Sequence, residues 1–181
     1  MAVAAQTIES ARVLAPLVIT FLAPFALWLL RKNQDLREGV SFVAAAMAFA
    51  SVVSMVPAVL HGSVWTYHLV TFFPGVSITF AVDGLSLIFA IVATFLWFFA
   101  TSYNIGYMRS LKEHAQTRYY FCFAVAIFGA VGVAFSGTVV TLYLFYEVIT
   151  VFTYPLVAHH QDAEGYHGAR KYLVYLMGTS K

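Results

Sequence analysis

Five predominantly apolar blocks, each about 20 residues long, constrain what this chain can fold into. A helix of that length crosses the ~30 Å hydrocarbon core of a bilayer, and it satisfies its own backbone hydrogen bonds there. With 61% hydrophobic and 10% charged residues, the chain lacks the polar surface that a soluble domain of this size needs. We therefore predict an all-α fold, a polytopic transmembrane helix bundle. Its full spans are predicted at residues 13–30, 40–60, 85–108, 119–136 and 139–159.

The last apolar segment, residues 169–181, begins a sixth span that is too short to cross the membrane. Its length corresponds to ~18 Å at the helical rise. A helix that stopped there would leave Lys181 and a carboxylate in hydrocarbon, at a cost of several kcal/mol. We therefore expect further sequence, or another chain, to complete this crossing. The first block follows only Glu9 and Arg12, a poor signal-peptide n-region, so we interpret it as a retained span.

The basic residues predict the orientation of the bundle. Cytoplasmic connections of membrane proteins carry an excess of Lys and Arg. The second connection, residues 61–84, and the fourth, around Gly137, contain neither. We therefore place the N-terminus outside and the first, third and fifth connections in the cytoplasm. The basic residues of those three connections are Arg31, Lys32 and Arg37, then Arg109, Lys112 and Arg118, then Arg170 and Lys171.

The rest of the chain offers little outside the membrane. Residues 61–84 form the long outside loop, and their Pro74-Gly75 turn followed by alternating residues predicts a short hairpin. We treat residues 1–181 as a single membrane domain. The lone Cys122 excludes a disulfide framework, and the histidines near 159–167 have no tight ligand spacing, so we expect no metal and no cofactor. A net charge of +2 does not suggest nucleic-acid binding.

Glu147 is the most informative residue, because it lies about halfway along the fifth predicted span. A charge at the bilayer centre costs at least ~2.5–3.5 kcal/mol, so such residues often mark ion or proton paths. At 100° per residue, Tyr143, Thr150 and Tyr154 share its face of the helix, which could support a chain of hydrogen bonds. The alternative is a protonated acid and hydroxyl groups that simply hold neighbouring helices together.

Lys171 is the second candidate for proton translocation, and Tyr175 lies one turn further on. It could instead be a lysine that extends to the membrane surface. We place Lys171 ~5 Å into its helix and Glu147 ~16 Å from the cytoplasmic end of its own, so we expect no direct salt bridge. Pro155 should kink the fifth span by removing a hydrogen bond to the Val151 carbonyl.

Asp83 precedes the third apolar block directly. An aspartate in that position is typical of a helix N-cap, because its carboxylate accepts hydrogen bonds from free amides of the first turn. We therefore expect a structural role for Asp83.

Three stretches together resemble a known family. They are residues 82–89 (VDGLSLIF), 103–108 (YNIGYM) and 143–150 (YLFYEVIT) with 154–157 (YPLV). This order is similar to the antiporter-like subunits shared by respiratory complex I and the Mrp-type multisubunit cation/proton antiporters. The run 114–120 (HAQTRYY) resembles the D-type subunit of that family.

The resemblance implies a fold and site residues. Members of this family have about fourteen crossings, built from two inverted repeats with broken helices near mid-membrane. Glu147 matches the fifth-helix glutamate implicated in proton translocation, and Lys171 matches a sixth-helix lysine in the context of residues 169–172 (ARKY). The main lysine partner of that glutamate lies on a seventh helix, which this sequence does not reach.

The function implied is proton translocation within a multisubunit cation/proton antiporter or a complex I-like membrane oxidoreductase, with no redox site in this chain. The expected partners are other membrane subunits, the lipid bilayer, and protons together with Na⁺ or K⁺, in the inner (plasma) membrane of the cell. Two alternatives stay open. One is a non-transporting structural subunit, and the other is a coupling module of a hydrogenase or an inorganic-carbon uptake complex.

Overall fold

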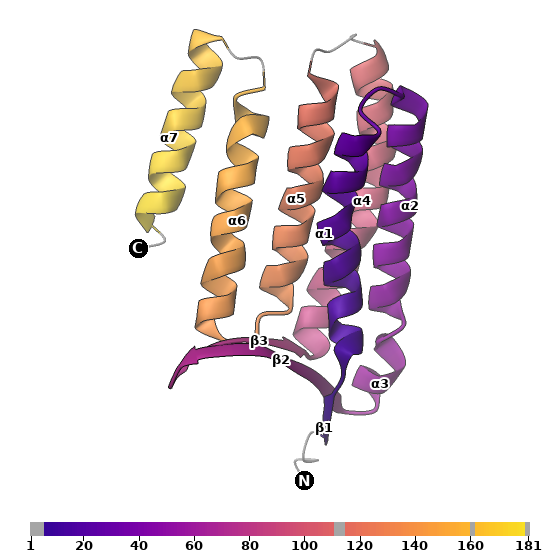
Figure 1. Ribbon diagram of the computed structural model, residues 1–181, viewed down its shortest axis with the longest axis vertical. Helices are drawn as coiled ribbons and strands as arrows, with labels where there is room; N and C mark the ends of the chain where they lie inside the picture. The colour runs from indigo at the N-terminus through magenta and orange to yellow at the C-terminus, as the bar shows by residue number, and fades with distance from the viewer. Residues whose placement is uncertain (1–5, 111–114, 160–161, 180–181) are drawn as a thin grey trace.

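The computed structural model describes residues 6–110, 115–159 and 162–179, and within them the chain is a bundle of long helices with a small sheet at one end (Figure 1). Five of these helices are long and apolar enough to cross a membrane, which confirms the predicted multi-pass bundle. The candidate spans are Ala11–Leu29, Gln34–Leu60, Gly84–Ser110, Gln116–Ala134 and Val139–Val157. The helices are α1 (Leu14–Leu29), α2 (Gln34–Val53), the short α3 (Val56–Leu60), α4 (Gly84–Ser110), α5 (Gln116–Ala134), α6 (Val139–Val157) and α7 (Ala163–Thr179).

The sixth long helix begins earlier than predicted, at Ala163 instead of near residue 169. Asp162 starts it: the Gly165 amide donates to Asp162 Oδ1 at 2.6 Å, and the Tyr166 amide donates to the Asp162 carbonyl at 3.0 Å. The prediction followed the apolar run and overlooked this polar first turn, in which an N-cap satisfies free amides. The 17 described residues of α7 form a helix about 25 Å long.

Helix α5 is central to the packing, with α1, α4 and α6 as its neighbours, while α2 packs on α1 and α4. Close approach between α5 and α6 depends on two glycines. A Cβ at Gly129 would lie 2.6 Å from Ile149 Cγ1, and a Cβ at Gly132 would overlap the ring of Phe145. Small residues let helix backbones approach closely in this way. The outermost helix, α7, is held by α6 (Figure 1).

The sheet consists of β1 (Gln6–Glu9), β2 (Ser63–Phe73) and β3 (Val76–Val82) in that order. Strands β2 and β3 form the hairpin predicted around Pro74-Gly75, and Gly75 takes the positive φ of 87° that the turn needs. The strands extend further than predicted, and β1 adds in parallel to β2. The edge of β3 is covered by the α5–α6 connection, since the Ala81 amide donates to the Phe135 carbonyl and the Gly137 amide to the Thr79 carbonyl, both at 2.8 Å.

The connections alternate between the two ends of the bundle, as the charge pattern requires. The α1–α2, α4–α5 and α6–α7 connections lie at one end, and the sheet and the start of the chain lie at the other (Figure 1). Arg31 and Arg118 therefore share one end, which the positive-inside rule assigns to the cytoplasm. We call it the basic end.

Candidate functional site

The position of Glu147 along α6 is set by a capped helix start. Thr138 is the N-cap, and its hydroxyl oxygen accepts from the Thr141 amide. Glu147 then lies eight residues from the first residue of α6 and ten from the last, which puts it ~15 Å from the basic end of the helix. The side chain is half-buried. This carboxyl group therefore sits near the middle of a candidate span.

Helix packing decides which way Glu147 faces. Phe145 turns toward α5, where it covers Gly132, and its ring centroid lies 5.3 Å from that of Phe128. Glu147 follows two residues later, about 200° around the helix, so it lies on the face opposite α5. Tyr143, one turn earlier along the helix, lies on the same face of α6. Two members of the predicted polar stripe therefore lie on the face of α6 that is turned away from α5.

The other two members of the stripe differ from each other. Thr150 is 2% exposed, and its hydroxyl donates to the Tyr146 carbonyl at 3.1 Å, so its proton is engaged within the helix. Tyr154 is half-buried. Pro155 lies in the last turn of α6, where its ring removes the hydrogen bond to the Val151 carbonyl while the helix continues to Val157.

Lys171 lies deeper than predicted, because α7 begins at Ala163. It is eight residues from the helix start, or ~12 Å, so its backbone lies within about 3 Å of the depth of Glu147 when both are measured from the basic end. The expectation that the two differ strongly in depth is therefore wrong. The Lys171 side chain is exposed and lines a hollow of about 330 Å³ with Tyr175 and His167, and Glu147 is not among the residues that line it.

One contact between α6 and α7 was missed from the sequence. The Thr153 hydroxyl and the Tyr172 phenol are 2.7 Å apart. This bond joins the turns that carry Tyr154 and Lys171, and it fixes the relative height of the two helices. The only sequence signal was a pair of hydroxyl-bearing residues beside the candidates, which is too common in membrane helices to be specific.

Asp83 lies at the sheet end of the bundle, away from Glu147. Its Oδ1 accepts from the Ser86 amide at 2.8 Å, and its carbonyl accepts from the Leu87 amide at 3.0 Å. The hydrogen bond from the Ser86 amide, which favours the charged form, lowers the pKa of Asp83. Asp83 therefore caps the first turn of α4.

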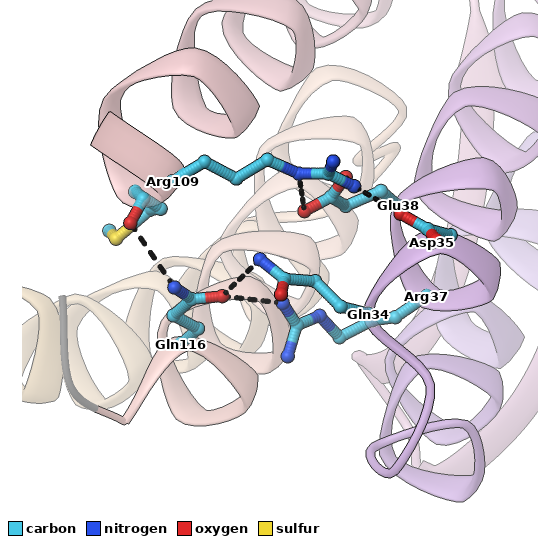
Figure 2. Close-up of polar contacts among 7 residues, drawn as sticks. Gln34, Asp35, Arg37, Glu38, Arg109 and Gln116 are labelled. Atoms are coloured by element: carbon cyan, nitrogen blue, oxygen red, sulfur yellow. Dashed lines mark hydrogen bonds and ion pairs between the residues drawn. The ribbon is translucent and has the colours of Figure 1, made fainter. Parts of the chain in front are cut away.

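A second polar cluster, at the basic end, was not anticipated (Figure 2). Arg109 on α4 forms ion pairs with Asp35 and Glu38 on α2, and its Nε donates to Glu38 Oε1 at 3.2 Å. Arg37 and Glu38 are each only 4% exposed. Sequence reasoning counted these arginines as orientation signals and ignored the carboxylates, because acidic residues contribute little to the positive-inside rule.

Gln116 extends this cluster to α5 (Figure 2). Its Oε1 accepts from Arg37 Nη2 at 2.8 Å and from Gln34 Nε2 at 3.1 Å, and its Nε2 donates to the Met108 carbonyl at 3.2 Å. Arg37 also donates to the Thr117 hydroxyl at 3.0 Å. The cluster joins α2, α4 and α5, and we interpret it as a structural clamp.

Comparison with known proteins shows what this chain is similar to. The family model described as NADH-ubiquinone oxidoreductase (complex I), chain 5 N-terminus, matches residues 74–120. The chain is 28% identical over 112 residues to the A1 subunit of the Na(+)/H(+) antiporter of Staphylococcus haemolyticus (strain JCSC1435), a match that covers 61% of this chain and 13% of that protein. The chain is thus similar to antiporter-like membrane subunits of complex I and of Na(+)/H(+) antiporters.

Another curated relative is also an antiporter subunit. The A1 antiporter protein of Staphylococcus aureus (strain JH9) is 28% identical over 102 residues, covering 55% of this chain and 12% of that protein. The chain thus spans 12–13% of the length of these two curated relatives. Both carry the A1 designation, so they do not support the leaning toward the D type that residues 114–120 suggested.

Two solved structures share the fold of this chain. The Mrp complex from Dietzia sp. DQ12-45-1b superposes with a TM-score of 0.65 and 21% identity, covering 82% of this chain and 28% of that one. The membrane-bound sulfane sulfur reductase, an archaeal respiratory membrane complex, gives 0.69 and 23%, covering 90% and 24%. The family match at residues 74–120 includes neither Glu147 nor Lys171, so the roles of both are matters of proposal.

Proposed function

We propose that this chain forms part of a proton-translocating subunit in a multisubunit cation/proton antiporter or a complex I-like membrane oxidoreductase. The observation that carries the proposal is the half-buried Glu147 near the middle of α6, on the face turned away from α5. In this proposal the chain works in the inner (plasma) membrane beside other membrane subunits, and the assembly exchanges protons for Na⁺ or K⁺.

A carboxyl group at this depth is suited to carrying a proton. Its charged form costs at least ~2.5–3.5 kcal/mol at the bilayer centre unless a partner or water compensates. The neutral form avoids this cost, so small changes in the surroundings decide whether Glu147 holds or releases its proton. In this proposal the Tyr143 phenol, one turn away on the same face of α6, serves as its hydrogen-bonding neighbour.

Lys171 provides the coupling in this mechanism. A lysine ammonium that approaches Glu147 favours the carboxylate and so favours proton release, and a lysine that withdraws favours proton uptake. The effect is reciprocal, because Glu147 changes the proton affinity of the lysine by the same factor. The similar depth of the two residues on neighbouring helices supports this assignment.

The test is Glu147→Gln, measured as proton-coupled cation transport in inverted membrane vesicles. We expect transport to be lost while the assembly still forms, because glutamine preserves shape and hydrogen bonding but cannot release a proton. Glu9→Gln, the same change in the exposed strand β1, is the matched control and should transport normally. Normal transport by Glu147→Gln would refute the proposal, and a loss of assembly with normal flux per complex would favour the structural alternative.

A further inference from the structure

A groove at the basic end of the bundle lies between α1 and α5 and is distinct from the Glu147 region. It has a volume of about 640 Å³, within the range of ordinary ligand sites. The part of the groove further from the basic end is apolar and is formed by Phe25, Trp28 and Phe121. The part at the basic end carries Arg31, Thr117 and Arg118. The groove therefore changes from apolar to basic along the direction of the membrane normal.

The two arginines have little else to neutralise them. Among the residues that the structure describes, the recorded ion pairs belong to Arg109, and neither Arg31 nor Arg118 takes part in one. The Arg31 guanidinium lies over the Trp28 ring, 5.0 Å from its centroid. Arg118 donates through Nη2 to the His159 carbonyl at 3.0 Å, and within the described part of the chain its buried Nε has no acceptor.

The start of α5 adds to this positive field. The N-cap residue is Ala115, whose methyl group cannot accept hydrogen bonds from the amides of the first turn. The N-terminal end of a helix carries partial positive charge and favours anions. Thr117 and Arg118 belong to that first turn and also line the groove.

We propose that this groove binds one anionic phospholipid of the cytoplasmic leaflet. The acyl chain lies against Phe25, Trp28 and Phe121, and the phosphate lies between Arg31 and Arg118 at the first turn of α5. Basic pockets between membrane helices on the cytoplasmic side recognise anionic headgroups in this way. Because Arg118 also bonds to His159, the bound lipid contacts the residue that holds the α6–α7 connection.

The experiment uses the purified protein in its native assembly, in phosphatidylcholine nanodiscs that contain a small fraction of a photoreactive lipid. Crosslinked peptides are mapped by mass spectrometry. We expect photoreactive phosphatidylglycerol to label residues 25–31 and 117–121 about tenfold more than photoreactive phosphatidylcholine does. The double variant Arg31→Gln/Arg118→Gln should lower this preference to near one, and Arg31→Lys/Arg118→Lys should retain most of it.

Lys32→Gln is the matched control, since Lys32 is exposed in the same connection but does not line the groove. Arg31→Gln alone tests the site without disturbing the bond from Arg118 to His159, and it should lower the preference several-fold. Three results would overturn the proposal. They are equal labelling by the two lipids, an equal loss with Lys32→Gln, and protection of the groove by a neighbouring subunit. Complete competition by inorganic phosphate would also overturn it, because the groove would then be a site for free anions.

Discussion

Replacing Gly132 with alanine tests whether the α5–α6 contact sets the position of the helix that carries Glu147. The added Cβ would overlap the Phe145 ring, which is 6% exposed and has Phe80 and Phe128 as ring neighbours at 5.8 Å and 5.3 Å. The ring therefore cannot move aside without disturbing two aromatic contacts.

The size of the effect can be worked out from three contributions. Overpacking in a closely packed core costs typically about 1–3 kcal/mol. Weakening the two ring contacts adds up to about 1–3 kcal/mol, and the better helix propensity of alanine returns about 1 kcal/mol. We expect Gly132→Ala to destabilise the folded state by about 3 kcal/mol, within a range of roughly 1–5 kcal/mol.

The assay is thermal unfolding of the purified protein in detergent, with two other glycines as matched controls. In Gly129→Ala the Cβ would lie 2.6 Å from Ile149 Cγ1 and 3.3 Å from the Ile149 nitrogen and the Phe145 carbonyl oxygen, whereas at Gly132 three ring atoms lie within 2.4 Å, so the cost at Gly129 should be smaller. Gly106→Ala in α4 meets nothing within 4 Å and should be neutral or slightly stabilising. In Gly132→Ala/Phe145→Ala the overlap is gone, so the double variant should be no less stable than Phe145→Ala alone. Equal stability of the Gly132→Ala and Gly106→Ala variants would refute the reasoning.

Two further changes test local contacts. Asp83→Ala should cost about 1 kcal/mol through loss of the α4 cap, whereas Asp83→Asn should retain most of the stability, as thermal unfolding will show. The pKa of Asp83 is lowered in the folded protein, so its carboxylate stabilises the fold above the unfolded-state pKa near 4, and this stabilisation is lost as the pH falls through the folded-state pKa. The difference in stability between wild type and Asp83→Ala should therefore shrink in acid. A difference that stays constant with pH would contradict the cap. Thr153→Val and Tyr172→Phe should each destabilise the α6–α7 pair by about 0.5–1 kcal/mol and should not add in a double-mutant cycle, while full additivity would show that their hydrogen bond contributes nothing.

Several elements of the structure follow from the sequence because they depend on short stretches of chain. Five spans could be drawn because lipid demands about 20 apolar residues in a row, which one segment either has or lacks. The hairpin at Pro74-Gly75 follows from turn chemistry in the same way. The position of Glu147 near the middle of α6 needed only the bounds of one helix.

Other features were beyond sequence reasoning because they depend on how separate segments meet. The start of α7 at Ala163 depends on a cap at Asp162, which lies outside the apolar run. Because the helix starts there, Lys171 lies at nearly the depth of Glu147. The pairing of Arg109 with Glu38 joins residues far apart in the chain. Strand β1 exists only because β2 offers it an edge.

The sequence by itself determined the class of this protein: its membrane-spanning character, the alternation of its connections and the presence of an acidic group near the middle of a candidate span. The hydrophobic requirement of lipid acts on each segment separately, so these properties can be read one segment at a time. Only the tertiary structure decided that Glu147 faces away from α5, that Lys171 lies near its depth, and that Arg31 after α1 shares one groove with Arg118 of α5. Those outcomes depend on the rotation and relative height of neighbouring helices, which are set by contacts such as Gly132 with Phe145 and Thr153 with Tyr172.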